Sequence, residues 1–224
     1  MMKLYDETNQ SDFGEQKRKA GYTMKIVFMG TPGLAAVVLE SLIAAGHEIA
    51  AVVTQPDKPK GRGGAVSSSP VKLLAVKEGI PVYQPVRIRG DEAFLQELAG
   101  LSPDVIAVAA FGQILPKAVL DLPRFGCINV HTSLLPKYRG AAPIQQAILD
   151  GEERTGVTIM DMAEGIDTGD MILQRAIPIE PDDTGESLTD KLAALGGEML
   201  VEALAQIEAG SAVRVRQEES KATY

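Results

Sequence analysis

Two polar side chains, Asn129 and His131, end the otherwise apolar run 126–131, whose pattern predicts a buried strand. Residues two apart on a strand point to the same face, so the amide and the imidazole can converge on one spot. Asp167 lies in the polar loop 165–170 and could reach across to orient His131. An imidazole oriented by a carboxylate can move protons near neutral pH. A single histidine at a strand end is often structural, so spacing alone leaves both roles open.

Two other features near predicted strand ends carry weaker signals. Cys127 lies on the same strand face as Asn129, but nothing nearby would lower its pKa, which favours a small core residue over a nucleophile. The segment Gly30-Thr-Pro-Gly33 forms a strand-to-helix turn. It lacks the Gly-x-Gly-x-x-Gly spacing of a dinucleotide site, and Pro32 removes an amide donor, so a plain tight turn competes equally with a ligand role.

A regular alternation of strands and helices must position these residues. We expect strands over 24–30, 48–54, 80–83, 104–109, 126–131, 155–161 and 171–179, the sixth more exposed and the last antiparallel to a neighbour. We expect helices over 33–45, 70–78, 91–99, 116–121, 143–149 and 185–209, the last opened by a capping box of Asp183 and Glu186. This order predicts an α/β, Rossmann-like fold with a mostly parallel, doubly wound sheet, where ligands bind beyond the carboxyl ends of strands.

The composition excludes several classes of protein. The chain has 224 residues, 45% of them apolar, with a net charge of −8 and one cysteine. A single cysteine excludes an internal disulfide and a cysteine-based metal cluster. No apolar run approaches the length of a membrane span, so we expect a cytoplasmic protein without a membrane partner. The negative charge argues against indiscriminate binding to a polyanion but permits a local basic loop to bind nucleic acid.

Two segments fall outside the regular alternation. Residues 1–23 are polar and lack periodicity, so we expect a disordered extension or tag before Met24. The loop over 55–69 is unusually long, with three glycines and the basic residues Lys58, Lys60 and Arg62. Its composition alone favours a solvated flexible loop over a phosphate-binding segment.

The motifs together resemble the folate-dependent formyltransferase family. The resemblance rests on Cys127 to Gln145 and on Gly165-Ile-Asp-Thr-Gly-Asp170, with supporting matches at 28–32, 54–63, 70–72 and 109–117. It covers residues 24–224 and is highly specific. It implies an enzyme that takes a formyl group from 10-formyltetrahydrofolate and gives it to an amine, here the amino group of methionyl initiator tRNA in translation initiation.

The resemblance also implies the roles of individual residues. The family's catalytic trio falls on Asn129, His131 and Asp167, with direct amine attack, a tetrahedral intermediate and no metal. The implied folate contacts are Phe111, Gly112, Ile114, Leu115, Ser133, Leu134, Leu135 and Pro136. The implied tRNA contacts are Lys58, Lys60 and Arg62. The resemblance therefore favours a functional role for the loop 55–69 over a solvated flexible segment.

The resemblance predicts the domain boundaries of the chain, and alternative functions remain possible. It implies a catalytic domain over 24–209 and, over 210–224, the start of a linker to a C-terminal β-barrel domain that is absent from this sequence. It implies no obligate protein partner. One rival is a sister formyltransferase acting on a glycinamide ribonucleotide or an amino sugar. The others are a folate-binding module without turnover and, by fold analogy alone, a dinucleotide-dependent oxidoreductase.

Overall fold

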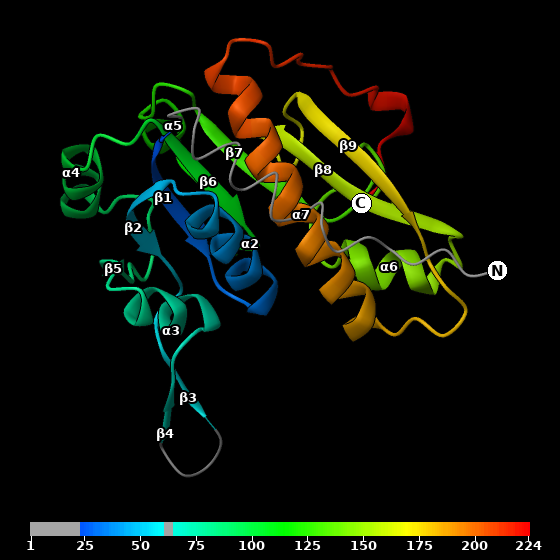
Figure 1. Cartoon of the computed structure of the whole chain (residues 1–224), viewed down its shortest axis with the longest axis horizontal. Helices are drawn as coiled ribbons and strands as arrows, with labels where there is room; N and C mark the ends of the chain where they lie inside the picture. Colours follow the sequence, from blue (N-terminus) through cyan, green and yellow to red (C-terminus); the bar gives the residue numbers. More distant parts are fainter. Residues whose placement is uncertain (1–22, 61–64) are drawn as a thin grey trace.

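The computed structural model describes residues 23–60 and 65–224, except for the side chains of residues 59, 60, 65 and 66 (Figure 1). Within these residues, seven strands form one mixed sheet in the order β5-β2-β1-β6-β7-β8-β9. Its strands are β1 (Lys25–Gly30), β2 (Glu48–Val53), β5 (Val82–Tyr83), β6 (Val105–Ala109), β7 (Cys127–His131), β8 (Arg154–Asp161) and β9 (Met171–Pro178). The strands from β5 to β7 run parallel, whereas β8 and β9 are antiparallel to their neighbours.

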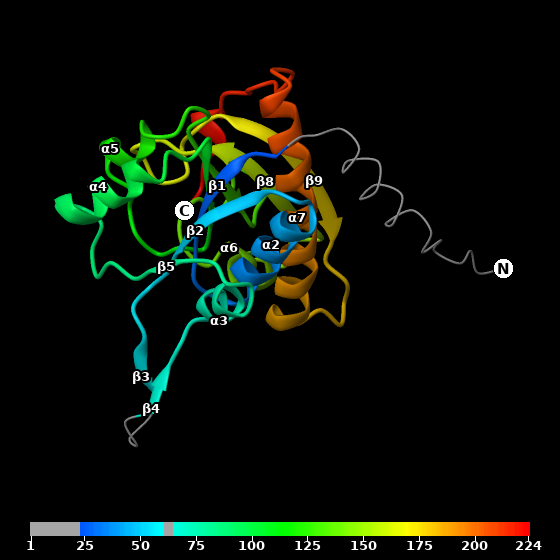
Figure 2. The ribbon, with the colours of Figure 1, turned by 60° about the vertical axis from the view of Figure 1, so that its left-hand side comes forward.

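Helices cover both faces of this sheet (Figures 1 and 2). They are α2 (Gly33–Ala44), α3 (Pro70–Lys77), α4 (Glu92–Gly100), α5 (Lys117–Leu120), α6 (Pro143–Leu149) and α7 (Gly185–Glu208). Alternate residues of β1 supply the two cores. Ile26 and Phe28 join the core with α2, α3 and α7, and Val27 and Met29 join the core with α4 and α5. The predicted doubly wound α/β fold is therefore confirmed.

Helix α7 lies directly on the strand that carries the candidate catalytic residues. A Cβ atom at Gly196 would stand 2.7 Å from Val130 Cγ1, and one at Gly197 would collide with Ser41 of α2. Larger side chains at these positions would push α7 away from β7 and α2. Because Val130 faces α7, its neighbours Asn129 and His131 face the opposite side of the sheet.

The structure corrects three local predictions. The segment 55–69 contains a two-stranded hairpin of β3 (Lys58–Lys60) and β4 (Ala65–Ser67). Strand β8 is buried over Thr155–Met160 rather than more exposed, because β7 and β9 flank it and α7 covers it. The capping box of α7 uses Thr184 and Ser187. Asp183 instead accepts a hydrogen bond from the Ser187 hydroxyl, 2.7 Å away.

The other boundaries agree closely, except that β5 is shorter than the predicted strand 80–83. The pairing of β9 antiparallel to β8 confirms the prediction for 171–179. Across the described ranges 23–60 and 65–224, no helix combines the length with the apolar content that a membrane crossing requires.

The residues after α7 return to the sheet. Met171 and Val215 exchange two backbone hydrogen bonds of 2.8 Å. The short 3₁₀ helix η2 (Glu219–Lys221) follows, and the Thr223 carbonyl oxygen accepts from the Arg139 amide at 2.8 Å. Whether this segment begins a linker stays a prediction, as does the division at residue 209. The predicted extension 1–23 lies outside the described residues except for Thr23.

Candidate active site at the carboxyl end of β7

The amide of Asn129 and the imidazole of His131 lie on one face of β7, close to its carboxyl end. Both side chains are almost fully buried. β7 is an inner strand between β6 and β8, so its backbone is fixed on both sides by sheet hydrogen bonds. The two donors therefore sit on a rigid part of the fold.

Asp167 joins them from the loop between β8 and β9. Its Oδ1 accepts a hydrogen bond from Asn129 Nδ2 at 3.4 Å, and its Oδ2 lies 3.6 Å from His131 Nδ1. The same Oδ2 accepts from the Gly140 amide at 2.8 Å. The backbone of Asp167 is left-handed, with φ of +50°. The structure thus brings the three predicted catalytic side chains together.

A backbone carbonyl fixes the orientation of the imidazole. His131 Nε2 lies 2.8 Å from the carbonyl oxygen of Tyr138. A carbonyl oxygen only accepts, so Nε2 carries the hydrogen and Nδ1 is directed at Asp167.

The segment that follows β7 is held tightly by β8 and β9. Thr158 Oγ1 donates to the Ser133 carbonyl at 2.7 Å and accepts from the Leu135 amide at 3.2 Å. Gln174 Nε2 donates to the Leu135 carbonyl at 2.9 Å. The side chains of Ser133 and Leu135 are buried, whereas Leu134 and Pro136 are partly exposed. Of these four predicted folate residues, only the latter two offer side-chain surface.

The other predicted folate residues follow β6. Phe111 and Leu115 are buried in the apolar core on the α4 and α5 face, together with Cys127. Ile114 is 69% exposed, and Gly112 is exposed with a left-handed backbone. The Phe111 carbonyl accepts from Gln55 Nε2 at 3.0 Å and from Thr31 Oγ1 at 3.3 Å. These bonds attach the segment to residues that follow β1 and β2.

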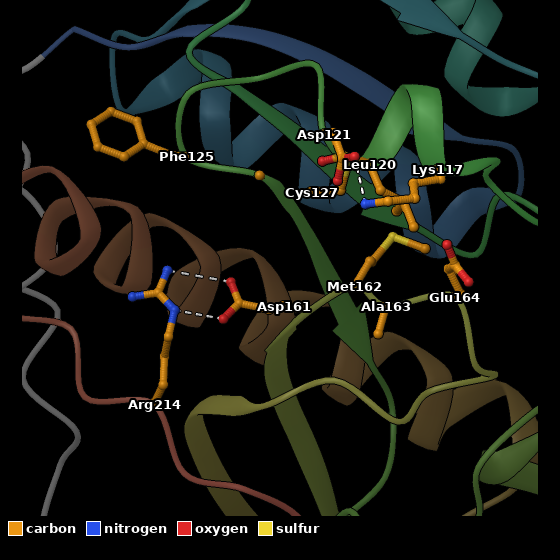
Figure 3. Close-up of a pocket in the computed structure, with 11 residues that line it drawn as sticks. Lys117, Leu120, Asp121, Phe125, Cys127, Asp161, Met162, Ala163, Glu164 and Arg214 are labelled. Atoms are coloured by element: carbon orange, nitrogen blue, oxygen red, sulfur yellow. Dashed lines mark hydrogen bonds and ion pairs between the residues drawn. The ribbon is translucent and has the colours of Figure 1, made fainter.

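A cavity of about 480 Å³ opens beside this core (Figure 3). Its lining consists of Lys117, Leu120, Asp121, Phe125, Gly126, Cys127, Asp161, Met162, Ala163, Glu164 and Arg214. Cys127 lies two residues before Asn129 on the same face of β7, and Met162 to Glu164 lead into the loop with Asp167. The cavity therefore lies at the amino end of β7, whereas Asn129 and His131 lie toward its carboxyl end.

None of the eight predicted folate residues, all of which the structure describes, lines this cavity. Phe111 and Leu115 stand behind its wall, because they pack with Cys127, Leu120 and Met162. The lining residues Lys117, Met162 and Glu164 were not among the predicted site residues, because a ligand was expected at the carboxyl end of β7. Because β8 is antiparallel to β7, the end of β8 lies beside the amino end of β7, where the cavity opens. The sequence did not specify the direction of β8, so it did not predict the position of this cavity.

Cys127 behaves as a core residue. Its thiol donates to the Val119 carbonyl at 3.5 Å, and burial raises the pKa of Cys127 to about 12. A thiol with so high a pKa is protonated at neutral pH and is a poor nucleophile.

The hairpin of β3 and β4 projects away from the body of the protein (Figure 2). The predicted tRNA residue Lys58 is exposed on β3. Arg62 and the side chain of Lys60 lie outside the described residues. Lys72 Nζ holds the base of the hairpin through Asp57 Oδ2 at 2.5 Å and Gln84 Oε1 at 2.8 Å. Hydrogen bonds from Lys72 and Gln84 lower the pKa of Asp57.

A comparison with known families agrees with this geometry. The family model described as Formyl transferase matches residues 24–204. That range is most of the chain, so the chain belongs to the formyl transferase family.

A curated relative, Methionyl-tRNA formyltransferase of Caldanaerobacter subterraneus subsp. tengcongensis, is 55% identical over 201 residues. The match covers 90% of this chain and 65% of that relative, so the chain spans slightly less than two thirds of the relative's length.

Solved structures share the fold at lower identity. Glycinamide ribonucleotide transformylase 1 of Symbiobacterium toebii matches with a TM-score of 0.72 at 21% identity, over 88% of this chain and 96% of that one. An N-formyltransferase of Helicobacter canadensis, in complex with folinic acid and dTDP-3-aminofucose, matches with a TM-score of 0.68 at 23% identity, over 90% and 70% of the two chains. At these identities the likeness concerns the fold alone.

Proposed function

We propose that this chain transfers the formyl group of 10-formyltetrahydrofolate to the free amino group of methionyl initiator tRNA, in the cytoplasm at the start of translation. The observation that carries the proposal is the close approach of Asn129, His131 and Asp167 at the end of β7. The 55% identity to a relative named for this reaction supports the choice of acceptor.

The chemistry follows from the types of side chain present. The amine nitrogen attacks the formyl carbon, and the electron pair of the C=O double bond moves to oxygen, which gives a tetrahedral intermediate. The intermediate collapses, its bond to N10 of the folate breaks, and tetrahydrofolate leaves. The proton lost by the attacking nitrogen balances the one gained by N10.

Asn129 Nδ2 and the imidazole of His131 serve as the donors to the negative oxygen of the intermediate. Removing one such donor typically costs about 10²–10³ in rate. The contact of Nε2 with the Tyr138 carbonyl fixes the plane of the ring before the substrate binds.

Asp167 orients the His131 imidazole and takes part in proton removal from the amine. Its Oδ2 is 3.6 Å from His131 Nδ1, slightly longer than a hydrogen bond, so a small shift would complete the contact.

The formyl donor is proposed to bind at the carboxyl end of the sheet, through the eight folate residues named from the sequence. Leu134 and Pro136 offer partly exposed side chains there, and Ile114 is exposed. Phe111 and Leu115 are buried in the core beneath that segment. Membership of the formyl transferase family supports a formyl donor of this kind.

The projecting hairpin is the proposed contact with tRNA, through Lys58, Lys60 and Arg62. The chain has a net charge of −8, so a phosphate backbone is best met by a basic segment that stands apart from the acidic body. Within this proposal, residues 24–209 form the catalytic domain and residues 210–224 lead toward the remainder of a longer protein.

The test is formyl transfer from 10-formyltetrahydrofolate to charged methionyl initiator tRNA, beside uncharged tRNA, a glycinamide ribonucleotide and an amino sugar nucleotide. We expect transfer to the charged tRNA alone. Transfer only to a small amine would move the assignment to a sister enzyme. Folate binding without transfer to any acceptor would instead indicate a binding module.

A further inference from the structure

A buried glutamine far along the chain contacts the loop that carries Asp167. Gln217 is 4% exposed and follows α7 in the returning C-terminal segment. Its Nε2 donates to the carbonyl oxygens of Asp167 and Gly169, each at 2.8 Å. Its Oε1 accepts from Arg139 Nε at 3.1 Å. Carbonyls only accept and a guanidinium only donates, so these partners fix the orientation of the amide.

The two carbonyls belong to the part of the loop with the least favourable backbone. A left-handed conformation such as that of Asp167 costs a non-glycine residue about 1–2 kcal/mol. At Gly169, a Cβ atom would collide with the Asp161 carbonyl, so the loop is also pressed against β8 there. One side chain therefore holds both ends of the turn that directs the Asp167 carboxylate at His131.

Arg139 holds Gln217 from the other side. Its guanidinium is fully buried and forms a bidentate pair with Glu219, at 2.8 Å and 3.0 Å. The next residue, Gly140, donates its amide to Asp167 Oδ2. The backbone and the carboxylate of Asp167 are thus held by two segments that Arg139 joins.

We propose that Gln217 is a positioning residue that sets the geometry of Asp167 toward His131, so that the segment 215–223 is a functional part of the active site. This inference rests on the catalytic role proposed for Asp167. It predicts that loss of the Gln217 amide displaces the Asp167 carboxylate and lowers turnover more than it weakens substrate binding.

The kinetic test compares Gln217→Met and Gln217→Glu with wild type in the full chain. Methionine keeps the volume without the hydrogen bonds, and glutamate keeps the bond to Arg139 but faces two carbonyl oxygens with a carboxylate. Gln206→Met is the matched control, because the side-chain amide of Gln206 donates to Glu202 of the same helix at 3.3 Å, far from Asp167 in the chain. We expect kcat to fall about 10- to 100-fold in both Gln217 variants, the size typical of displaced catalytic groups, with KM much less changed. Equal kcat in all four proteins would overturn the inference.

A second measurement separates positioning from folding. In an Asp167→Asn background, Gln217→Met should cost little further activity, because residues that act as one unit are not additive. A loss of the same factor in both backgrounds would indicate a structural role only. Should Asp167→Asn itself keep wild-type turnover, the catalytic role proposed for Asp167 fails and the inference about Gln217 fails with it, while formyl transfer by the chain stands.

A third measurement needs no turnover. The NMR proton shift of the Gly140 amide reports its hydrogen bond to the Asp167 carboxylate. We expect it to move upfield in Gln217→Met and Gln217→Glu and to stay in place in Gln206→Met. An unmoved Gly140 signal in both Gln217 variants would overturn the inference, whatever the activity of the chain.

Discussion

The end of β7 and the β3–β4 hairpin are both proposed to meet the same tRNA, yet they are built in opposite ways. At β7 the polar side chains are buried and each is held by several partners, as Asp167 is held by Gly140, Asn129 and Gln217. The hairpin projects away from the body on two short strands, with an exposed Lys58 and hydrogen-bonded support at its base from Lys72 and Gln84 (Figure 1).

The difference follows from what each region has to do. A catalytic group misplaced by about 1 Å can lose a factor of 10² in rate, so its supports must be rigid. Attraction to a phosphate backbone acts over roughly a Debye length, about 8–10 Å in physiological salt, and tolerates movement. The buried network therefore supplies geometry and the hairpin supplies charge and reach.

The largest expected effect is at the catalytic end. Asn129→Ala and His131→Ala should each lower kcat by about 10²–10³, because each removes one donor to the tetrahedral oxygen. Formyl transfer under saturating substrates measures this. The control is His47→Ala, at the other end of the sheet, which should keep near-normal turnover. Near-normal turnover in both site variants would contradict the assignment.

The second effect concerns the stability of the buried network. Arg139→Met should lower the free energy of unfolding by roughly 2 kcal/mol, since the buried amide of Gln217 loses a charge-assisted hydrogen bond and Glu219 loses its bidentate partner. Arg175→Met removes a surface ion pair with Glu198 and Glu202 and should cost under about 1 kcal/mol. Urea denaturation of both variants gives the comparison, and a larger loss for Arg175 would refute it.

The third effect is at the base of the hairpin. Lys72→Met should raise the KM for tRNA roughly three- to ten-fold, the size of one or two lost hydrogen bonds, with KM for the folate unchanged. Lys191→Met, which removes a pair with Asp183 at the start of α7, is the control. An equal rise in both KM values would mean that the hairpin base and the folate site are not separate.

The smallest effect is a dependence on pH in both regions. Lys72 lowers the pKa of Asp57 at the hairpin, and Arg139 lowers the pKa of Glu219 at the catalytic end. A carboxyl whose pKa is lower in the folded state stabilises the protein above its unfolded pKa, and this stability is lost as pH falls through the folded pKa. Wild type should therefore exceed Asp57→Asn and Glu219→Gln in stability at pH 6. That excess should disappear as the pH falls below the ordinary carboxyl pKa values, 3.8 for aspartate and 4.5 for glutamate.

Urea denaturation from pH 6 to pH 3 tests this dependence. We expect the larger difference for Asp57, whose side chain is 23% exposed against 68% for Glu219, because solvent screens the exposed pair more strongly. An excess that grows toward low pH would reverse the sign and exclude the explanation.

The strands and most helices were predictable because their apolar periodicity is local. The run at 126–131 and the N-cap Ser69 before Pro70 each carry their signal within a few residues, and the structure has β7 and α3 there. The β3–β4 hairpin was missed because each of its strands is only three residues long. The segment that joins them is rich in glycine and carries a charge, a composition typical of a loop. The burial of β8 was missed because it depends on β9 and α7, which pack on it from elsewhere in the chain.

The sequence by itself determined the alternating α/β order, the shared face of Asn129 and His131, and the basic character of the hairpin, since each rests on residues close in the chain. Only the tertiary structure decided that Asp167 turns toward them, that the cavity lies beside Cys127 and Met162, and that Arg139 meets Gln217. These contacts join residues that are tens of positions apart, such as Arg139 and Gln217 at a separation of 78. Their geometry depends on the direction of β8 and on the path of the chain after α7, neither of which a local pattern encodes.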